Sequence, residues 1–555
     1  MKKLWSLLVM VIFMTGMVVA QDNSATANQN GDKNSAGQTQ DGSSNTATVD
    51  QNTPGANVVQ GQTATQWQEG DDNEASIIQN TWGANAEGNT TTQEQYGIDN
   101  EASAKSNGSL NMVTQYQDGE LNKSSLYTGG SQNTVGVHQY GISNVANGQL
   151  LGDELNMVNV MQDGTSNMTV FRIEYGDGND VDIDQIGEDN KVGGYGDPGV
   201  HIWGSSNTVD IDQYGNQEMV EVGKANEASV LIEGEGNMST IEQEGQYNMA
   251  THTMQGSAVD GNEAETQQDG YSNIAEVKQR SNNNVAFQLQ DAYKPADNIM
   301  DNDDNNEADW NESYITQEGG TNNSAETYQF GDRNKATVVQ DGNNNILVAD
   351  QGIWDQRPGV GAANHGYDNV LEAKMKGDEN EITAIQDGFN NTMQFDLYTR
   401  RDGSNDRNII DNAYQLGGHN TMNVTVKGDD NTTFDFDQLG HKNTIKGLSG
   451  YKTFIYEGNE AEDFTIYQIG VANLVEGRVF DGTGIDLNIN QEGYHNFSEL
   501  RIHDWNNVID INQVSPDDIL MGERNEAFIK QFGGSNGAFV NQVGTNNVAN
   551  IHQTH

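Results

Sequence analysis

The sequence predicts an all-β fold: a single long β-solenoid of strand–turn–strand coils, each of about 22–23 residues, with protruding loops. Three observations lead to this fold class. A short phrase, Gln-x-Gly-x-x-Asn, recurs along the whole chain, an alternating polar and apolar run follows the copies, and the prolines lie between them. Each predicted element follows from one of these three patterns.

The phrase recurs at a regular spacing. Gln29, Gln40 and Gln51 are spaced by 11 residues near the N-terminus, and the last copies, between 531 and 553, keep the same spacing. In between, many copies start 22 or 23 residues apart, for example at positions 95, 117, 139, 162 and 185. A fixed period in this range indicates one supersecondary unit that is stacked many times.

The run after each asparagine is typical of a β-strand. From Asn45 onward, Ala47, Val49 and Gln51 share one face, because side chains alternate with period two, and the other face carries Thr and Asp. The segment 179–185, NDVDIDQ, alternates in the same way, with aliphatic residues on one face and aspartates on the other. A helix would need apolar residues at a spacing of about 3.6, which this pattern lacks.

The phrase itself predicts the corner between two strands. Its glycine supplies a backbone position with positive φ, and its asparagine tolerates the left-handed region and can hydrogen-bond its own turn. Stacked coils place Gln over Gln and Asn over Asn about 4.8 Å apart, so that each amide can donate to the amide above. A thin core of Ala, Val, Ile and Met then lies between two amide ladders.

The predicted ladder residues are Gln29, Asn34, Gln40, Asn45, Gln51, Gln68, Asn73, Gln79, Gln329, Asn334, Gln340, Gln531, Asn536, Gln542, Asn547 and Gln553. The predicted turn glycines are Gly31, Gly42, Gly70, Gly331, Gly342, Gly533 and Gly544.

The N-terminus predicts a signal peptide at 1–20. Lys2 and Lys3 precede an apolar stretch from Leu4 to Val19, and small residues lie at the expected cleavage site. No later window approaches the run of about 20 apolar residues that a membrane span requires. We therefore expect a single exported domain at 21–555, either soluble or surface-associated.

The composition excludes several classes of protein. The chain has no cysteine, so disulfides and thiolate metal sites are impossible. A hydrophobic content of 34% is too low for an ordinary globular core of this length, yet the periodic placement of the apolar residues argues against disorder. A net charge of -55, with 27 Lys and Arg against 82 Asp and Glu, argues against a nucleic-acid partner.

The prolines mark the interruptions of the repeat. A proline cannot donate to a β-ladder, and all five lie between copies of the phrase: Pro54, Pro198, Pro295, Pro358 and Pro516. The repeat resumes after each interruption, which indicates loops rather than domain linkers. We expect loop insertions near 191–203, 291–310, 352–368, 396–412, 447–464 and 514–523.

The repeat resembles the curlin repeat of bacterial curli fibres. In that family Gln, Gly, Asn, Ala and Gln follow at the spacing seen in the segment 40–51, QDGSSNTATVDQ, and again in 68–79 and 329–340. About 19 strict copies of the hexamer cover nearly the whole mature chain, with gaps at the loops. The resemblance implies a secreted, extracellular or surface-located amyloid subunit of the biofilm matrix of a bacterium with an outer membrane.

The resemblance also implies partners. These are copies of the chain itself or related curlin-like subunits, an outer-membrane channel of the curli type for export, and surface or matrix components. Family members are usually much shorter and have few long insertions. A bulk fibre subunit, a minor component, a cap and an adhesin therefore all stay open.

The sequence offers little catalytic chemistry. No HExxH motif or comparable ligand spacing appears, and the scattered histidines are expected to be solvated surface residues: His138, His201, His252, His365, His419, His441, His495, His503, His552 and His555. A β-helix enzyme acting on polysaccharide is an alternative, but such enzymes usually hold their anionic substrates with basic residues, in which this chain is poor. We expect no catalytic residues and no enzyme activity.

Calcium is the one cofactor that the sequence leaves open. Asp182 and Asp184 should lie beside Asp210 and Asp212 if their coils are neighbours, and hard divalent cations relieve repulsion between such carboxylates. A solvated acidic face is the simpler interpretation. The leading hypothesis is a structural fibre protein without cofactor or metal, and the alternative is a soluble calcium-stabilised adhesin.

Overall fold

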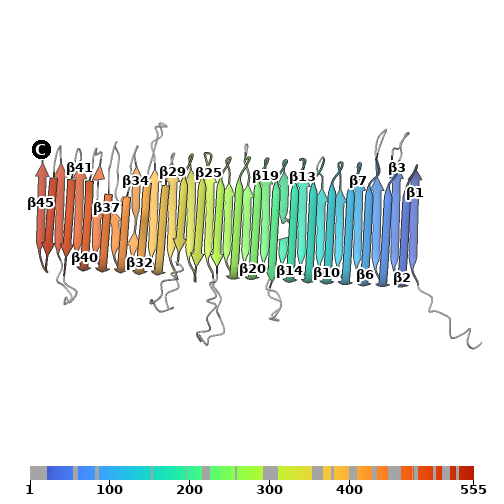
Figure 1. The fold of residues 1–555 in the computed structure, drawn as a ribbon, viewed down its shortest axis with the longest axis horizontal. Helices are drawn as coiled ribbons and strands as arrows, with labels where there is room; N and C mark the ends of the chain where they lie inside the picture. The colour runs from blue at the N-terminus through green and yellow to red at the C-terminus, as the bar shows by residue number, and fades with distance from the viewer. Residues whose placement is uncertain are drawn as a thin grey trace, which may run out of the picture. The chain divides into compact units, whose positions relative to one another are not determined.

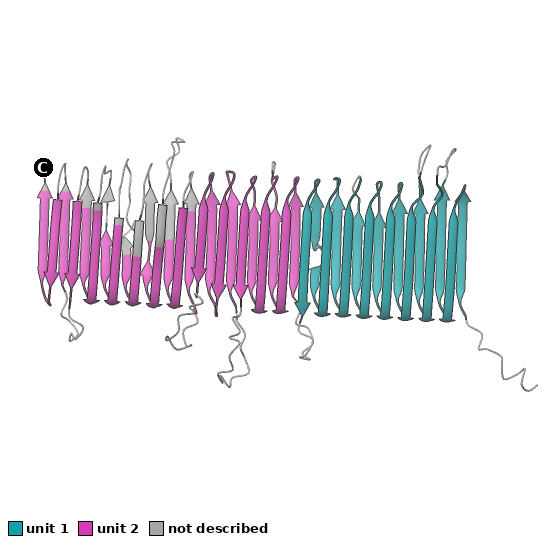
Figure 2. Ribbon diagram, in the orientation of Figure 1, with its two compact units in different colours: residues 1–225 teal, residues 226–555 magenta. Residues whose placement is uncertain are grey.

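The computed structural model consists of β-strands and the corners that join them. It describes residues 22–53, 60–81, 87–151, 154–194, 197–215, 226–256, 259–291, 310–352, 367–376, 381–398, 409–427, 434–447, 464–477, 479–480, 486–503, 508–515, 525–532 and 537–554. Every regular element in these ranges is a strand, which confirms the predicted all-β class. The chain forms two compact units, 1–225 and 226–555, and each is described by itself (Figure 2).

Unit 1 contains two parallel sheets, and the chain passes from one to the other at each corner (Figure 1). Sheet I consists of β1 (Ser24–Gly31), β3 (Thr46–Thr53), β5 (Glu74–Asn80), β7 (Glu101–Asn107), β9 (Lys123–Thr128), β11 (Val145–Leu150), β13 (Met168–Glu174), β15 (Lys191–Gly194) and β17 (Val200–Trp203), with the short β16 (Asp197–Pro198) paired to β15. Sheet II consists of β2 (Ser35–Ser43), β4 (Thr63–Asp71), β6 (Thr90–Ile98), β8 (Met112–Glu120), β10 (Thr134–Ile142), β12 (Met157–Thr165), β14 (Asp180–Glu188) and β18 (Thr208–Gly215).

The strands of unit 2 again alternate between two parallel sets, which are called sheets III and IV here. Sheet III consists of β19 (Glu227–Glu233), β21 (Met249–Met254), β23 (Ile274–Gln279), β25 (Glu312–Glu318), β27 (Lys335–Asp341), β29 (Val370–Lys376), β31 (Thr392–Tyr398), β33 (Thr421–Met422), β34 (Val424–Lys427), β36 (Thr444–Gly447), β38 (Leu474–Gly477), β39 (Val479–Phe480), β41 (Phe497–His503), β43 (Glu526–Phe532) and β45 (Val548–Thr554). Sheet IV consists of β20 (Met238–Gln246), β22 (Glu263–Tyr271), β24 (Val285–Asp291), β26 (Ser324–Phe330), β28 (Ile346–Gln351), β30 (Glu381–Phe389), β32 (Ile409–Gly418), β35 (Phe434–His441), β37 (Phe464–Val471), β40 (Asp486–Tyr494), β42 (Val508–Val514) and β44 (Gly537–Val543).

The strands stack in register, so each residue type lies over its own copy. The predicted period holds where nothing is inserted, as between Gln95 and Gln117, which are 22 residues apart. Where the connecting segment is longer the distance in sequence grows, and Gln40 lies 28 residues before its partner Gln68. The predicted β-solenoid is therefore confirmed within each unit, with coils of variable rather than constant length.

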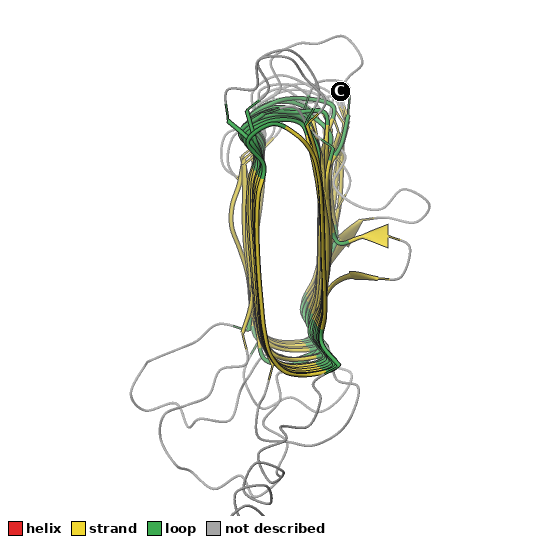
Figure 3. Ribbon diagram, turned by 90° about the vertical axis from the view of Figure 1, so that its right-hand side faces the viewer, coloured by secondary structure: helices red, strands yellow, loops and turns green. Residues whose placement is uncertain are grey.

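The core of each unit is the thin space between its two sheets, which Figure 3 shows in end-on view. Inward positions alternate with outward ones along every strand, and the inward Val137, Val160, Ile183 and Ile211 of sheet II are fully buried. Toward the N-terminus, Val49, Ala64 and Ile77 form a smaller cluster between the sheets. Apolar burial thus follows the period-two pattern of the sequence.

The predicted loop at 191–203 is wrong in part. Lys191 and Val192 continue sheet I by pairing with β13, and Val200 to Trp203 pair with the same strand further along. Between them, Pro198 pairs antiparallel with Gly193, so this proline lies inside a coil. One strand position of the coil is split into two segments that both keep their inward residues buried, and the absence of the repeated phrase concealed this.

The other predicted insertions lie wholly or mainly outside the described residues, as does the predicted signal peptide at 1–20. Within the insertion predicted at 396–412, residues up to Tyr398 belong to β31 and those from Ile409 belong to β32. The assignment of 21–555 to a single domain stays a prediction.

Candidate functional site

The inward glutamines of sheet II form an unbroken chain of side-chain hydrogen bonds. In every step, Nε2 of one glutamine donates to Oε1 of the glutamine in the next coil over 2.8 or 2.9 Å. Each amide is further fixed by a backbone carbonyl, as when Gln68 Nε2 also donates to the carbonyl of Asn73 over 3.0 Å. The ladder consists of Gln40, Gln68, Gln95, Gln117, Gln139, Gln162, Gln185 and Gln213.

Sheet IV of unit 2 contains an equally continuous ladder. Its steps measure 2.7 to 3.0 Å and all run in the same direction, from Nε2 of the earlier residue to Oε1 of the later one. The ladder consists of Gln243, Gln268, Gln290, Gln329, Gln351, Gln386, Gln415, Gln438, Gln468, Gln491, Gln513 and Gln542. Continuity of the ladder gives each buried amide a donor and an acceptor.

A further ladder in sheet II was missed by the sequence analysis. Gln38, Gln66, Gln93 and Gln115 are joined by three bonds of 2.8 Å, two residues before the main ladder on the same inward face. The sequence does contain the pattern that predicts this ladder, because a period of two places Gln38 on the same face of the strand as Gln40. The N-terminal coils of unit 1 are therefore held by amides where later coils have Val and Ile.

The corresponding ladder in sheet I is short. Gln29 donates to Gln51 over 2.7 Å, and Gln51 donates to Gln79 over 2.9 Å. From there the same inward position is occupied in turn by Ser106, Thr128, Leu150, Ile173 and Ile202. The ladder gives way first to hydroxyls and then to aliphatic side chains.

Sheet III has two separate ladder segments. Gln279, Gln317 and Gln340 are joined over 3.0 and 2.8 Å, and Gln531 donates to Gln553 over 2.9 Å. The coil before Gln279 has Met254 in the ladder position, and the coil before Gln531 has Ile502. At both places the Oε1 atom that faces the apolar neighbour is buried without a hydrogen-bond partner, because a ladder of this polarity needs a donor from the preceding coil.

Stacked asparagines bond one another in many coils, as when Nδ2 of Asn122 donates to Oδ1 of Asn100 over 3.2 Å, and they also bond the backbone of neighbouring coils. The Oδ1 atom of Asn45 accepts the backbone N–H of Asn73 in the next coil over 3.0 Å, and its Nδ2 atom donates to the carbonyl of Gly70 over 2.7 Å. Asn334 bonds the coils in the same manner, since its backbone N–H donates to Asn311 Oδ1 over 3.0 Å. Each asparagine therefore ties the corner of one coil to the backbone of its neighbours.

The left-handed residue at the corner is the one before the asparagine. Ser44 has φ of 58° and Asp72 has φ of 57°, whereas Asn45 and Asn73 are absent from the positive-φ set. The expectation that the asparagine takes the left-handed conformation is wrong, because the asparagine lies directly before the next strand, as Asn45 does before β3. Its side chain caps the corner from the strand side.

The turn glycines adopt positive φ where the structure describes them. Gly31, Gly42, Gly70, Gly331, Gly342 and Gly544 have φ between 91° and 132°. At Gly42 a Cβ atom would lie 1.8 Å from the carbonyl oxygen of Gly70 in the next coil, so both the conformation and the close stacking require glycine. Gly533 and Asn536 lie outside the described residues.

The remaining predicted ladder residues lie at corners or at the last coil. Asn34 Oδ1 accepts the backbone N–H of Gln62 over 3.2 Å, and Asn547 donates its own backbone N–H to Asn525 Oδ1 over 3.2 Å. Gln542 ends the ladder of sheet IV and donates to the carbonyl of Glu526 over 3.0 Å. Gln553 donates to the carbonyl of Gly537 over 3.0 Å.

Comparison with protein families agrees with this geometry. Residues 20–52, 156–187, 320–352 and 522–554 match the model of the curlin associated repeat. The chain contains curlin repeats. No curated protein matches the chain. The four matched segments include stretches of both units, and each contains the Gln-x-Gly-x-x-Asn phrase whose amides build the ladders.

The aspartates singled out in the sequence are neighbours in this curlin-repeat protein. Asp182 lies opposite Asp210, and Asp184 lies opposite Asp212, on the outward face of β14 and β18. Partial burial and the neighbouring Asp182 raise the pKa of both Asp184 and Asp210. Among the residues that the structure describes, no group of three or more His, Asp or Glu side chains could hold a metal ion. Calcium binding stays a prediction.

One histidine of the curlin-repeat protein is in the core rather than on the surface. His252 is fully buried in β21, where its Nδ1 atom lies 2.8 Å from Ser239 Oγ and its Nε2 atom lies 2.8 Å from Thr266 Oγ1. Burial lowers the pKa of His252 to about 3. The expectation of a solvated side chain is wrong here, and counting by twos from Asn248 would have placed His252 inward.

The described part of the curlin-repeat protein contains no helix of the length and apolarity that a membrane span requires.

Proposed function

We propose that this curlin-repeat protein is a secreted structural protein that assembles into extracellular amyloid-like fibres by stacking coil on coil. The observation that carries the proposal is the continuous, directional glutamine ladder of sheets II and IV. A ladder with a fixed direction presents Oε1 acceptors at one end and Nε2 donors at the other. A further copy that adds in the same register extends the ladder without an orphaned amide.

The first and last described coils support such an addition. Their inward residues correspond position by position: Ala36 with Ala538, Gln40 with Gln542, and Gln29 with Gln553. Head-to-tail contacts of this kind do not close on themselves and generate filaments. Biofilm matrix and cell-surface adhesion are the proposed setting, with export through an outer-membrane channel of the curli type.

Assembly of the mature chain tests this proposal. A net charge of -55 opposes association, and salt screens that repulsion to about 10 Å at 0.1 M ionic strength. We expect growth of light scattering and of thioflavin fluorescence when salt is added at neutral pH, with fibres in electron micrographs. A monomer that persists at high salt without dye binding would contradict the fibre proposal.

A substitution series tests the role of the ladder in assembly. Replacing Gln531, Gln542 and Gln553 by Leu removes the amides of the last coils, and we expect assembly to slow by an order of magnitude or more, since each lost buried bond costs about 1–3 kcal/mol. A matched triple change of outward residues serves as the control, with Thr46, Thr48 and Asp50 replaced by Ser. Equal slowing in the two variants would remove the inward–outward distinction on which the proposal rests.

A calcium-stabilised adhesin is the second candidate. The pairing of Asp182 with Asp210 and of Asp184 with Asp212 favours it, because two carboxylate rows on neighbouring coils repel each other. We expect calcium to raise the melting temperature of the mature chain if these rows bind it, and Asp182→Asn with Asp210→Asn to abolish the rise. An unchanged melting temperature in the unmodified chain would remove this candidate.

A further inference from the structure

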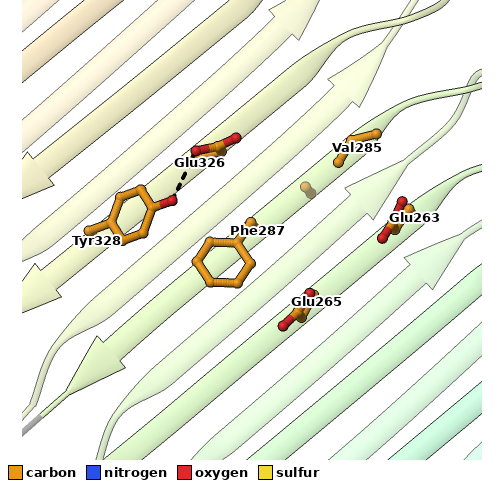
Figure 4. A pocket seen from close by; sticks show the side chains of 7 residues that line it. Glu263, Glu265, Val285, Phe287, Glu326 and Tyr328 are labelled. Atoms are coloured by element: carbon orange, nitrogen blue, oxygen red, sulfur yellow. Dashed lines mark hydrogen bonds between the residues drawn. The ribbon is translucent and has the colours of Figure 1, made fainter.

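The outward face of sheet IV has a shallow groove with an aromatic floor. The groove has a volume of about 240 Å³, and its lining includes Glu263 and Glu265 of β22, Phe287 of β24, and Glu326 and Tyr328 of β26 (Figure 4). Phe287 lies between Glu265 and Glu326 at the same height of the sheet. The rings of Phe287 and Tyr328 have centroids 5.4 Å apart at an angle of 47°.

The groove lies among strands without positive charge. The six strands β20, β22, β24, β26, β28 and β30 contain no Lys, Arg or His. They carry the carboxylates Glu242, Glu244, Glu263, Glu265, Asp269, Asp291, Glu326, Asp350, Glu381 and Asp387. A ligand that enters the groove therefore meets carboxylates from several coils.

Sheet III of the same unit has the opposite character. Several of its outward glutamates are paired with cations of the same sheet, as in the contacts of Lys335 with Glu312 at 2.5 Å and of Lys374 with Glu372 at 2.7 Å. The lack of cations on the groove strands is thus a property of that face and not of unit 2 as a whole.

The carboxylates of the groove keep acceptor capacity for a ligand. Glu326 accepts a hydrogen bond from the Tyr328 hydroxyl over 2.9 Å, and Glu265 accepts one from Gln267 over 2.8 Å. Each of these bonds comes from a neutral donor and uses one oxygen, so the second oxygen of each carboxylate is available. Burial and the bond to Glu326 raise the pKa of Tyr328 to about 12, so the phenol stays a donor to Glu326.

An adjacent carboxylate also lacks a donor. Asp350 lies beside Tyr328 in the next strand, and its Oδ1 atom is buried without a hydrogen-bond partner. Burial, with a contribution from Asp387, raises the pKa of Asp350 to about 6. Asp350 thus adds a carboxylate to the strand beside the groove, whose lining it does not join.

The position of the groove excludes one common form of peptide recognition. Strand β24 is paired on both sides, with β22 and with β26, so its backbone cannot accept an added strand. Recognition must run through side chains alone. The aromatic floor also distinguishes the groove from a site for a bare divalent ion, whose ligands are oxygens around the whole ion.

We propose that this groove binds a protonated amino sugar, presented as one residue of a cationic glycan. A sugar ring has an apolar face of C–H groups that can lie on Phe287 and Tyr328, while its ammonium group and hydroxyls donate to Glu265 and Glu326. A cation within about 6 Å of an aromatic ring gains further attraction from the ring itself. The groove is smaller than the roughly 300–1,000 Å³ of sites for drug-sized ligands, which suits a single ring of a longer chain.

The test is a binding titration of the mature, unassembled chain with short oligomers of glucosamine, at a pH where the amine is protonated. The N-acetylated oligomer of the same length is the matched ligand, since it keeps the ring and loses the charge. We expect saturable binding of the glucosamine oligomer, with the N-acetylated oligomer bound at least about fivefold more weakly. Equal affinity for the two oligomers, or no binding of either, would overturn the proposal.

Protein variants locate the binding. Glu265→Gln, Glu326→Gln and Phe287→Leu each change an outward side chain, and we expect each to weaken binding by about three- to fivefold. Glu276→Gln in β23 is the control, because it removes the same charge from an ion-paired position of sheet III. An equal loss in the control, or equal binding of polylysine with the same sensitivity to the groove variants, would show general attraction of cations and contradict the glycan assignment.

Discussion

Sheets II and IV differ from sheets I and III in the continuity of their glutamine ladders. The ladder of sheet II runs from Gln40 to Gln213 with a glutamine in every coil, and none of its glutamines has an unpaired buried oxygen or nitrogen. In sheet I the ladder ends at Gln79, and the hydroxyls of Ser106 and Thr128 that follow it are buried without partners. In the ladder segments of sheet III the unpaired amide atoms are the Oε1 atoms of Gln279 and Gln531.

This difference shows where the inward amides contribute to stability and where other side chains can replace them. A coil tolerates Ile173 in the ladder position, because Leu150 and Ile202 in the neighbouring coils are also aliphatic and no polar group there is left unpaired. The unpaired oxygens of Gln279, Gln531 and Thr128 occur at boundaries, where an amide or hydroxyl lies next to an apolar residue of the neighbouring coil. The stabilisation comes from continuity over many coils rather than from any single glutamine.

The largest expected effect on stability is the pH dependence that His252 causes. His252 lies in sheet III, two residues before the ladder position of Met254. The pKa of His252 is about 3 in the folded chain, against an ordinary value of 6.5. The unfolded chain therefore binds more protons between these values, so stability is complete above pH 6.5 and falls as the pH drops toward 3. The local loss reaches about 5 kcal/mol.

Hydrogen exchange of peptides from β21 at neutral and acidic pH measures this loss. The control is His252→Val, which matches the in-register Val277 of the next coil and removes the titrating group. We expect a smaller acid-induced rise of exchange in the variant. The same rise in both proteins would assign the acid sensitivity to carboxylates instead.

The second prediction compares two substitutions that introduce a glutamine, one among aliphatic residues and one at the end of a ladder segment. Ile173→Gln lies between Leu150 and Ile202, so the new amide finds no partner in either neighbouring coil and destabilises the region by about 1–3 kcal/mol. Met254→Gln lies next to Gln279, whose unpaired Oε1 atom gains a donor, and we expect a change of less than about 1 kcal/mol. Local hydrogen exchange of the strands that contain the substitutions compares the two. Equal destabilisation would show that an amide added at the end of a ladder segment is as costly as one added among aliphatic residues.

The third prediction compares two substitutions that remove a glutamine, one in the middle of a ladder and one at its end. Gln268→Leu leaves Oε1 of Gln290 without its donor, creating one new unpaired buried atom at a cost of about 1–3 kcal/mol. Gln279→Leu moves an existing boundary by one coil and leaves the number of unpaired acceptors unchanged. We therefore expect the loss in local stability, followed by urea-dependent hydrogen exchange, to be clearly larger for Gln268→Leu. The reverse order would contradict a stabilising role for continuity.

The smallest expected effect is on the outward face of sheet III. Lys335→Gln breaks the contact with Glu312, in which both side chains are substantially exposed, and such pairs contribute about 0–1 kcal/mol. We expect a shift in melting temperature within the error of a repeated measurement. A loss as large as that for Gln268→Leu would show that outward charges, and not the inward amides, hold the coils together.

The coil and its two faces follow from the linear pattern of residues. Because side chains alternate with period two and the phrase repeats, the linear pattern alone places Gln40, Gln68 and their copies over one another, as the strand register confirms. The turn glycines followed from the phrase in the same way. These are local or strictly periodic properties, which a linear pattern expresses directly.

The hydrogen bonds that each amide makes depend on how the coils stack in three dimensions. The direction of the ladder, the backbone bonds of Asn45 and the unpaired oxygen of Gln279 depend on which residue occupies the neighbouring coil. The sequence alone does not identify that neighbouring residue where the segments between strands differ in length. Phe287 and Glu326 lie side by side although they are 39 positions apart, because the long segment 292–311 intervenes between β24 and β25. Stacking follows the register of the strands rather than distance along the chain, and for this reason the groove could not be predicted from the repeat.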